Sequence, residues 1–134
     1  MKYLKRFNES LSNDFTLDLK DFCEGYLAYL IDEGFEVDVQ HMYSKDKYKH
    51  IDFHLIAIKK LGKLSKWEEI KDYFIPFISV LSKEYNLGYI TFYGIKYCNS
   101  IHKEPVSKLY YAKNIIDDYI NFKFPIEFIT IIVK

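Results

Sequence analysis

The sequence contains few of the residues on which disulfide frameworks and small metal clusters depend. Its 134 residues include two cysteines, three prolines and five glycines. Cys23 and Cys98 lack the close spacing that zinc sites and thioredoxin-like motifs require. We therefore expect two buried free thiols in a reducing compartment, with a disulfide between them as the alternative.

Net charge is absent as well, because 19 basic residues balance 19 acidic ones. The chain therefore lacks the overall field that draws proteins to nucleic acids or anionic membranes. No apolar run approaches the roughly 20 residues that a spanning helix needs, and MKYLKR continues into FNES rather than into an apolar signal core. We expect a soluble protein that a classical signal peptide does not export and that binds no membrane.

Catalytic signatures are also missing. The chain has no G-x-S-x-G, no H-E-x-x-H and no phosphate-cradling glycine loop. We therefore expect a protein that is not an enzyme and needs no cofactor. The chain is instead rich in hydrophobic residues, which make up 49% of it and include 13 tyrosines and 11 phenylalanines. That is more than one small core readily buries, and the length predicts a single domain.

Hydrophobic periodicity predicts the first half of the fold. A helix is expected from Thr16, its N-cap, to about Glu33, and Gly34 should end it in the left-handed conformation. Residues 35–60 alternate as a β-hairpin, FEVDVQHMY and HIDFHLIAI, around the polar loop SKDKYK.

The second half is predicted to add a helix and at least two strands. Ser65 and Glu68 match a capping box for a helix in which Pro76 indicates a kink or a split. GYITFYGIKYC and FPIEFITIIVK have the composition of strands. Between them, residues 99–123 are read either as a helix or as a short strand, SKLYY, followed by a helix.

These elements predict an α+β fold. We expect a two-layer sandwich with a mainly antiparallel four-stranded sheet and helices on one face, in the neighbourhood of ferredoxin-like folds.

The predicted hairpin register brings apolar side chains to one face of the sheet. Those placed on that face are Val37, Val39, Phe53 and Leu55. The opposite face then collects two carboxylates and two imidazoles, from Asp38, His50, Asp52 and His54. Such a face suits solvent, or a divalent metal that activates water for hydrolysis. We expect no metal, and name these four residues as its ligands if one binds.

The third predicted strand carries an aromatic stripe. Its members on one face are Tyr89, Tyr93 and Tyr97, with Lys96 beside them. Aromatic side chains on a sheet surface pack against partner proteins or stack on unpaired bases. A protein partner or self-association is our first hypothesis, and single-stranded nucleic acid is the alternative.

The opening MKYLKRFNES resembles short lysine-and-aromatic leaders of small uncharacterised α+β proteins from large tailed bacteriophages. In T4-like phages, a related leader is cut after a glutamate, and Phe7 to Glu9 fit that pattern. The resemblance implies a phage protein located in the host cytoplasm or the virion. Residues 1–14 would be an N-terminal arm or leader, and residues 15–134 the single domain.

Taken together, these observations predict a non-enzymatic phage protein. It would be a virion component or a protein-binding accessory factor that acts through an aromatic sheet surface. A single-stranded nucleic-acid-binding protein is the alternative, and a metal-dependent hydrolase comes third.

Overall fold

The computed structural model describes the backbone of residues 3–134 and the side chains of residues 14–134. The leader expected over residues 1–14 lies almost wholly outside the described side chains. The elements in this part of the chain are α1 (Tyr3–Tyr26), α2 (Ala28–Asp32), β1 (Phe35–Lys45), β2 (His50–Lys60), α3 (Trp67–Glu84), β3 (Leu87–Tyr97), β4 (Lys103–Tyr111), α4 (Ala112–Ile116) and β5 (Ile126–Val133).

All the described strands form one antiparallel sheet with the order β1-β2-β5-β3-β4. The fold is therefore α+β, as predicted, but the sheet has five strands rather than four. The additional strand is β4, which pairs with β3 from Tyr89 opposite Tyr111 to Tyr97 opposite Lys103. Of the two readings of residues 99–123, the structure agrees with the short strand SKLYY followed by a helix, because SKLYY is the end of β4 and α4 follows it. Only Tyr110 of this edge strand is buried, so the first half of β4 has no apolar alternation that would predict it.

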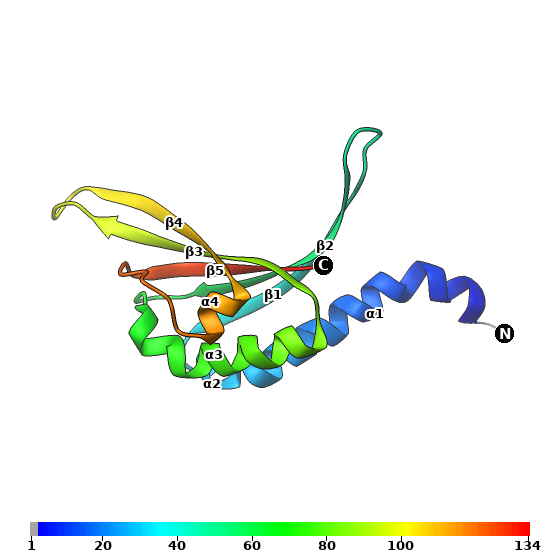
Figure 1. Ribbon diagram of the computed structural model, residues 1–134, viewed down its shortest axis with the longest axis horizontal. Helices are drawn as coiled ribbons and strands as arrows, with labels where there is room; N and C mark the ends of the chain where they lie inside the picture. The colour runs from blue at the N-terminus through cyan, green and yellow to red at the C-terminus, as the bar shows by residue number, and fades with distance from the viewer. Residues whose placement is uncertain (1–2) are drawn as a thin grey trace.

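The molecule has two layers, with the sheet on one side and the helices on the other (Figure 1). Their apolar sides meet in one core, whose largest fully buried side chains include Phe74, Phe77, Phe92, Leu19, Leu27, Ile56 and Ile58. The β1–β2 and β3–β4 hairpins extend beyond this body at opposite ends (Figure 1). No helix of the described chain is long and apolar enough to cross a membrane.

The first helix starts earlier than predicted. α1 begins at Tyr3, so Thr16 lies inside it instead of capping it. Leu27 separates α1 from α2, which supplies the last turn. Gly34 follows with a φ of 98°, a left-handed conformation that side chains disfavour. The predicted glycine stop is confirmed.

The second long helix begins two residues after the predicted cap. The Lys66 amide donates to Glu69 Oε1 at 3.1 Å, and α3 starts at Trp67. Ser65 has a different role, because its carbonyl accepts the Ile126 amide at 2.7 Å and links the helix entry to β5. α3 continues through the exposed Pro76 as one helix rather than two.

The β1–β2 register differs from the predicted one, and the difference reverses the faces of β2. Val39 pairs with Ile56, not with Phe53. Because the shift is an odd number of residues, every β2 side chain moves to the other face. Ile56 and Ile58 therefore enter the core, and Phe53 and Leu55 lie on the face away from the helices.

The turn sets this register. Lys45 pairs with His50, which leaves residues 46–49 as the loop. The Asp46 carbonyl accepts the Lys49 amide at 3.3 Å, and its carboxylate accepts the Tyr48 amide at 3.2 Å. The loop is shorter than the expected SKDKYK, and these two hydrogen bonds close the hairpin at Lys45 and His50.

Both cysteines are free. Cys23 lies in the core, and burial, the larger cause, raises the pKa of its thiol to about 12 with a smaller contribution from Glu24. Cys98 is exposed, because it lies where the β3–β4 hairpin has left the body. The expectation of two buried thiols is correct for Cys23 and wrong for Cys98.

Candidate functional site

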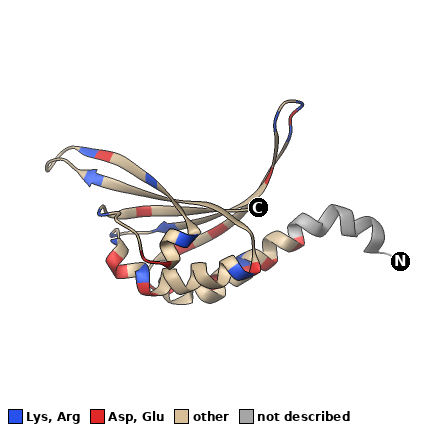
Figure 2. Cartoon of the chain, viewed as in Figure 1, with Lys and Arg blue, Asp and Glu red and all other residues tan. Residues whose placement is uncertain are grey.

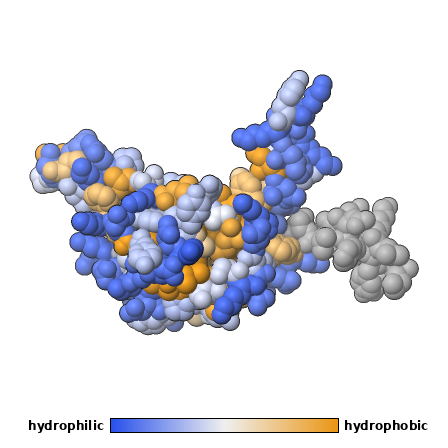
Figure 3. Space-filling model, in the orientation of Figure 1, coloured by the Kyte–Doolittle hydropathy of each residue, from blue (hydrophilic) through white to orange (hydrophobic). Residues whose placement is uncertain are grey.

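The sheet face turned away from the helices carries an uncovered apolar surface. We call it the open-face cluster; its members are Met42, Phe53, Leu55, Tyr89, Tyr93, Leu109, Tyr111, Phe128 and Ile132. None of the described elements packs over it (Figure 1). Leu109 is 51% exposed and Tyr111 59%. Hydrophobic atoms are visible along the upper rim of the body, between the two hairpins (Figure 3).

Two pairs of aromatic rings pack against each other at the centre of this cluster. Tyr93 and Phe128 face each other across β3 and β5, with centroids 4.2 Å apart and planes 16° apart. Tyr89 and Tyr111 form a second pair across β3 and β4, at 5.1 Å. Their mutual hydrogen bond is the main cause that raises the pKa of Tyr111. The rings therefore support one another and form a connected surface.

The residues named from the sequence for this surface are placed as follows. Tyr89 and Tyr93 belong to the open-face cluster, on the side of β3 opposite the buried Phe92. Tyr97 is 55% exposed near the hairpin end, with Lys103 Nζ 5.7 Å from its ring centroid. Lys96 is exposed beside it, opposite Glu104. Their binding role stays a prediction.

The open face is polar along its β1 edge. Glu36, Asp38 and Gln40 project there, and Gln40 Nε2 donates to Asp38 Oδ2 at 3.3 Å. Figure 2 shows charged residues on both hairpins and along the helices. The apolar area is therefore bordered by charge, as in many protein contact surfaces.

On the helix-covered side, the sheet brings together a histidine cluster, consisting of His41, Asp52 and His54. His41 Nε2 donates to Asp52 Oδ1 at 2.7 Å. The imidazoles of His41 and His54 stack, with centroids 4.5 Å and planes 12° apart. The hydrogen bond from His41 is the largest cause that lowers the pKa of Asp52, and the charges of the nearby histidines act in the same direction against desolvation.

The first helix covers one end of the histidine cluster. His54 is 8% exposed; its Nε2 lies 3.0 Å from Thr16 Oγ1, and its ring lies 4.5 Å from that of Phe15. His50, near the hairpin end, contacts Tyr43 edge-on at 5.9 Å. His54 is thus built into the contact between α1 and β2, whereas Asp52 faces solvent.

The structure does not assemble the four metal ligands named from the sequence. Asp38 lies on the open face, while His50, Asp52 and His54 alternate on the covered face of β2. The register shift is the reason, because it carries the β2 residues across the sheet. The partner that sequence reasoning missed is His41, which meets Asp52 only in the observed register.

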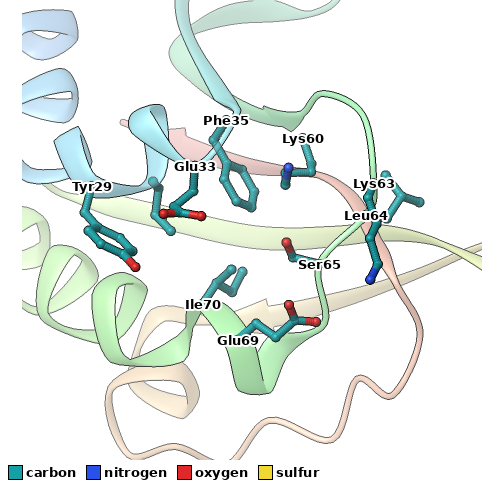
Figure 4. A pocket seen from close by; sticks show the side chains of 10 residues that line it. Tyr29, Glu33, Phe35, Lys60, Lys63, Leu64, Ser65, Glu69 and Ile70 are labelled. Carbon is teal, nitrogen blue, oxygen red and sulfur yellow. The ribbon is translucent and has the colours of Figure 1, made fainter.

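A pocket lies where α2, the start of β1 and the entry to α3 meet (Figure 4). It has a volume of about 360 Å³, and its lining is Tyr29, Leu30, Glu33, Phe35, Lys60, Lys63, Leu64, Ser65, Glu69 and Ile70. Two of its charged groups have local hydrogen bonds: Lys60 Nζ donates to the Leu61 carbonyl at 3.0 Å, and Glu69 caps α3.

Tyr29 at the rim of this pocket is also engaged. Its ring stacks on that of Tyr73, with centroids 4.0 Å and planes 12° apart. The hydrogen bond with Tyr73, followed by the negative charge of Glu33, raises the pKa of Tyr29 to about 12. The ring stack and this hydrogen bond link α2 to α3.

Comparison of the chain with protein-family models, curated proteins and solved structures finds no match.

Proposed function

We propose that the protein is a non-enzymatic binding protein that contacts a protein partner through the open-face cluster. The observation that carries this proposal is an apolar sheet face with no described element over it. The outer face of an antiparallel sheet is ordinarily polar, and exposed contiguous apolar patches mark interaction sites. Tyrosine and phenylalanine at its centre are residues that interface cores favour.

Ring packing favours a protein over single-stranded nucleic acid as the partner. Tyr93 and Phe128 present their flat faces to each other, so those faces are not free to stack on bases. Acidic Glu36 and Asp38 border the same surface and would repel phosphates. Both features are compatible with an apolar protein surface that has a charged rim.

The test compares the wild type with the double variant Leu109→Glu/Tyr111→Glu. Both side chains are more than half exposed, so the fold should persist. The matched control is Tyr119→Glu, because Tyr119 is 74% exposed but lies outside the sheet. Sedimentation equilibrium and binding of an apolar-surface dye are the measurements.

We expect the wild type to self-associate with rising concentration, or to bind the dye as a monomer. Either property should decrease in the double variant and persist in Tyr119→Glu. A strictly monomeric wild type that binds no dye would contradict the proposal.

Within this function, we place the protein in a large tailed bacteriophage, as a virion component or an accessory factor in the host cytoplasm. Support comes from the leader-like MKYLKRFNES. Mass spectrometry of purified virions tests the first assignment, and the N-terminal peptide shows whether the chain is cut after Glu9. The ferredoxin-like relationship expected from the sequence also stays a prediction.

Single-stranded nucleic acid is the second candidate, and the β3–β4 hairpin end favours it. There Tyr97 is exposed beneath Lys103, with Lys96 adjacent. An aromatic ring beside lysines is a common combination for stacking on bases and contacting phosphates. Fluorescence anisotropy with labelled oligonucleotides at low salt tests it: salt-sensitive binding that Tyr97→Ala or Tyr93→Ala weakens would support this role, and absence of binding would dismiss it.

A further inference from the structure

We propose that the tip of the β3–β4 hairpin binds a zinc ion through Cys98, His102 and Glu104. Their ligand atoms, one thiol, one imidazole nitrogen and one carboxylate oxygen, all lie within 4.8 Å of one another. Among the described residues, this is the one such group of three. The site is separate from the open-face cluster, and the inference does not depend on the function proposed above.

Strand pairing explains why these three side chains meet. Tyr97 opposite Lys103 is the last pair of the β3–β4 ladder. The next residues, Cys98 and His102, stay joined because the Cys98 amide donates to the His102 carbonyl at 3.0 Å. Glu104 lies two residues beyond His102, on the same side of β4, since side chains alternate along a strand.

An asparagine side chain holds the turn between them. Asn99 Oδ1 accepts the amides of Ile101 at 2.8 Å and His102 at 2.7 Å. This arrangement is an Asx turn, in which the side chain replaces a backbone acceptor. Hydrogen bonds therefore hold the backbone of the turn before any ion binds, which reduces the backbone ordering that binding requires.

The distance between the imidazole and the carboxylate suits a tetrahedral ion. With metal–ligand bonds of about 2.0–2.3 Å, neighbouring ligand atoms of a tetrahedral zinc site lie roughly 3.3–3.8 Å apart. His102 Nε2 and Glu104 Oε1 are 3.5 Å apart. The Cys98 thiol lies within 4.8 Å of both of these atoms, and it is exposed and free.

The donor set selects among metals. A thiolate with an imidazole favours zinc over magnesium or calcium, which prefer oxygen ligands. Three protein ligands leave a fourth position for water. The thiol must lose its proton for the sulfur–metal bond to form, so binding releases that proton to solvent and strengthens as the pH rises.

The experiment titrates the full chain, without a polyhistidine tag, with Co²⁺ as a spectroscopic substitute and then with Zn²⁺ as competitor. We expect one Co²⁺ per chain, with a thiolate-to-metal charge-transfer band that Zn²⁺ removes. Cys98→Ser should abolish the band, and His102→Ala and Glu104→Gln should each weaken binding by at least about tenfold. His50→Ala is the matched control, an exposed histidine of the other hairpin, and should bind like the wild type.

A second measurement needs no variant. Zn²⁺ should slow alkylation of Cys98 by a maleimide, while the buried Cys23 stays unreactive in either condition. A missing band at excess Co²⁺, or a Cys98 alkylation rate that Zn²⁺ does not change, would overturn the site. If His102→Ala and Glu104→Gln both bind Co²⁺ as tightly as the wild type, the site is overturned too, since the cysteine alone would then account for binding.

Discussion

The two faces of the sheet are both apolar, but only one of them is covered. On the helix side, Ile56, Ile58 and Ile131 are fully buried. On the other side, their strand neighbours Leu55 and Ile132 form an equally apolar pair that remains partly exposed. The same strands thus build a core on one side and a core-like surface on the other.

This contrast separates what the fold needs from what it leaves available. Covered side chains stabilise the fold by leaving water, at about 25 cal/mol per Å² of apolar area. Open-face side chains remain partly exposed to solvent, so polar residues at these positions would leave the isolated domain about as stable. Their apolar character is better explained by a partner that removes them from water.

The largest expected effect comes from truncating one phenylalanine on each face. Phe92 is fully buried and its ring contacts those of Trp67 and Phe74. We expect Phe92→Ala to lower the free energy of unfolding by about 3–5 kcal/mol. Phe128→Ala on the open face should cost only about 1 kcal/mol, mainly through its stack with Tyr93. Urea denaturation followed by far-UV circular dichroism measures both, and equal losses would mean that the open face is packed as tightly as the core.

A smaller effect, with opposite signs, is expected from adding a methyl group at two glycines. A Cβ on Gly94 would lie 2.5 Å from the Pro125 carbonyl oxygen and 2.8 Å from the Phe122 ring. Gly94→Ala should therefore destabilise the protein by about 1–3 kcal/mol through overpacking. Gly25 lies in α1 with nothing within 4 Å of such a Cβ, so Gly25→Ala should stabilise by up to about 1 kcal/mol. Thermal unfolding of the two variants measures both changes in stability. If Gly94→Ala is as stable as the wild type, the Pro125 backbone and the Phe122 ring can move aside to accommodate the methyl group.

Much of the fold could be predicted because its signals are local. The helix stripe from Leu19 onward, the Gly34 stop and the hairpin of residues 35–60 each follow from a short pattern. The register could not be predicted in the same way, because both faces of β2 are apolar. Ile56 with Ile58 and Leu55 with Ala57 offer competing core faces, and hydrophobicity alone does not choose between them.

In the candidate site, too, features set by a local sequence pattern could be predicted, and features set by strand register could not. The tyrosines of β3 could be assigned to one face because Ile90 and Phe92 mark the other. The histidine cluster could not be predicted, because His41 and Asp52 meet only in the observed register. Nor could the grouping of Cys98 with His102, because it depends on the first half of β4, and only the second half, SKLYY, is suggested as a strand by the sequence.

The smallest expected effect lies where the covered face opens to solvent, at Asp52. Its pKa is lowered first by the hydrogen bond from His41, so this group contributes stability above its unfolded-state pKa. That contribution is lost as the pH falls through the lower, folded-state pKa. We expect His41→Ala to raise the pKa of Asp52 toward the ordinary carboxylate value in an NMR titration, and His50→Ala to raise it less, because His50 acts only through its charge. If Asp52 has the same pKa in the wild type and in His41→Ala, the 2.7 Å contact between His41 and Asp52 does not persist in solution. These two side chains would then be separately solvated and would not belong to the ordered, helix-covered face.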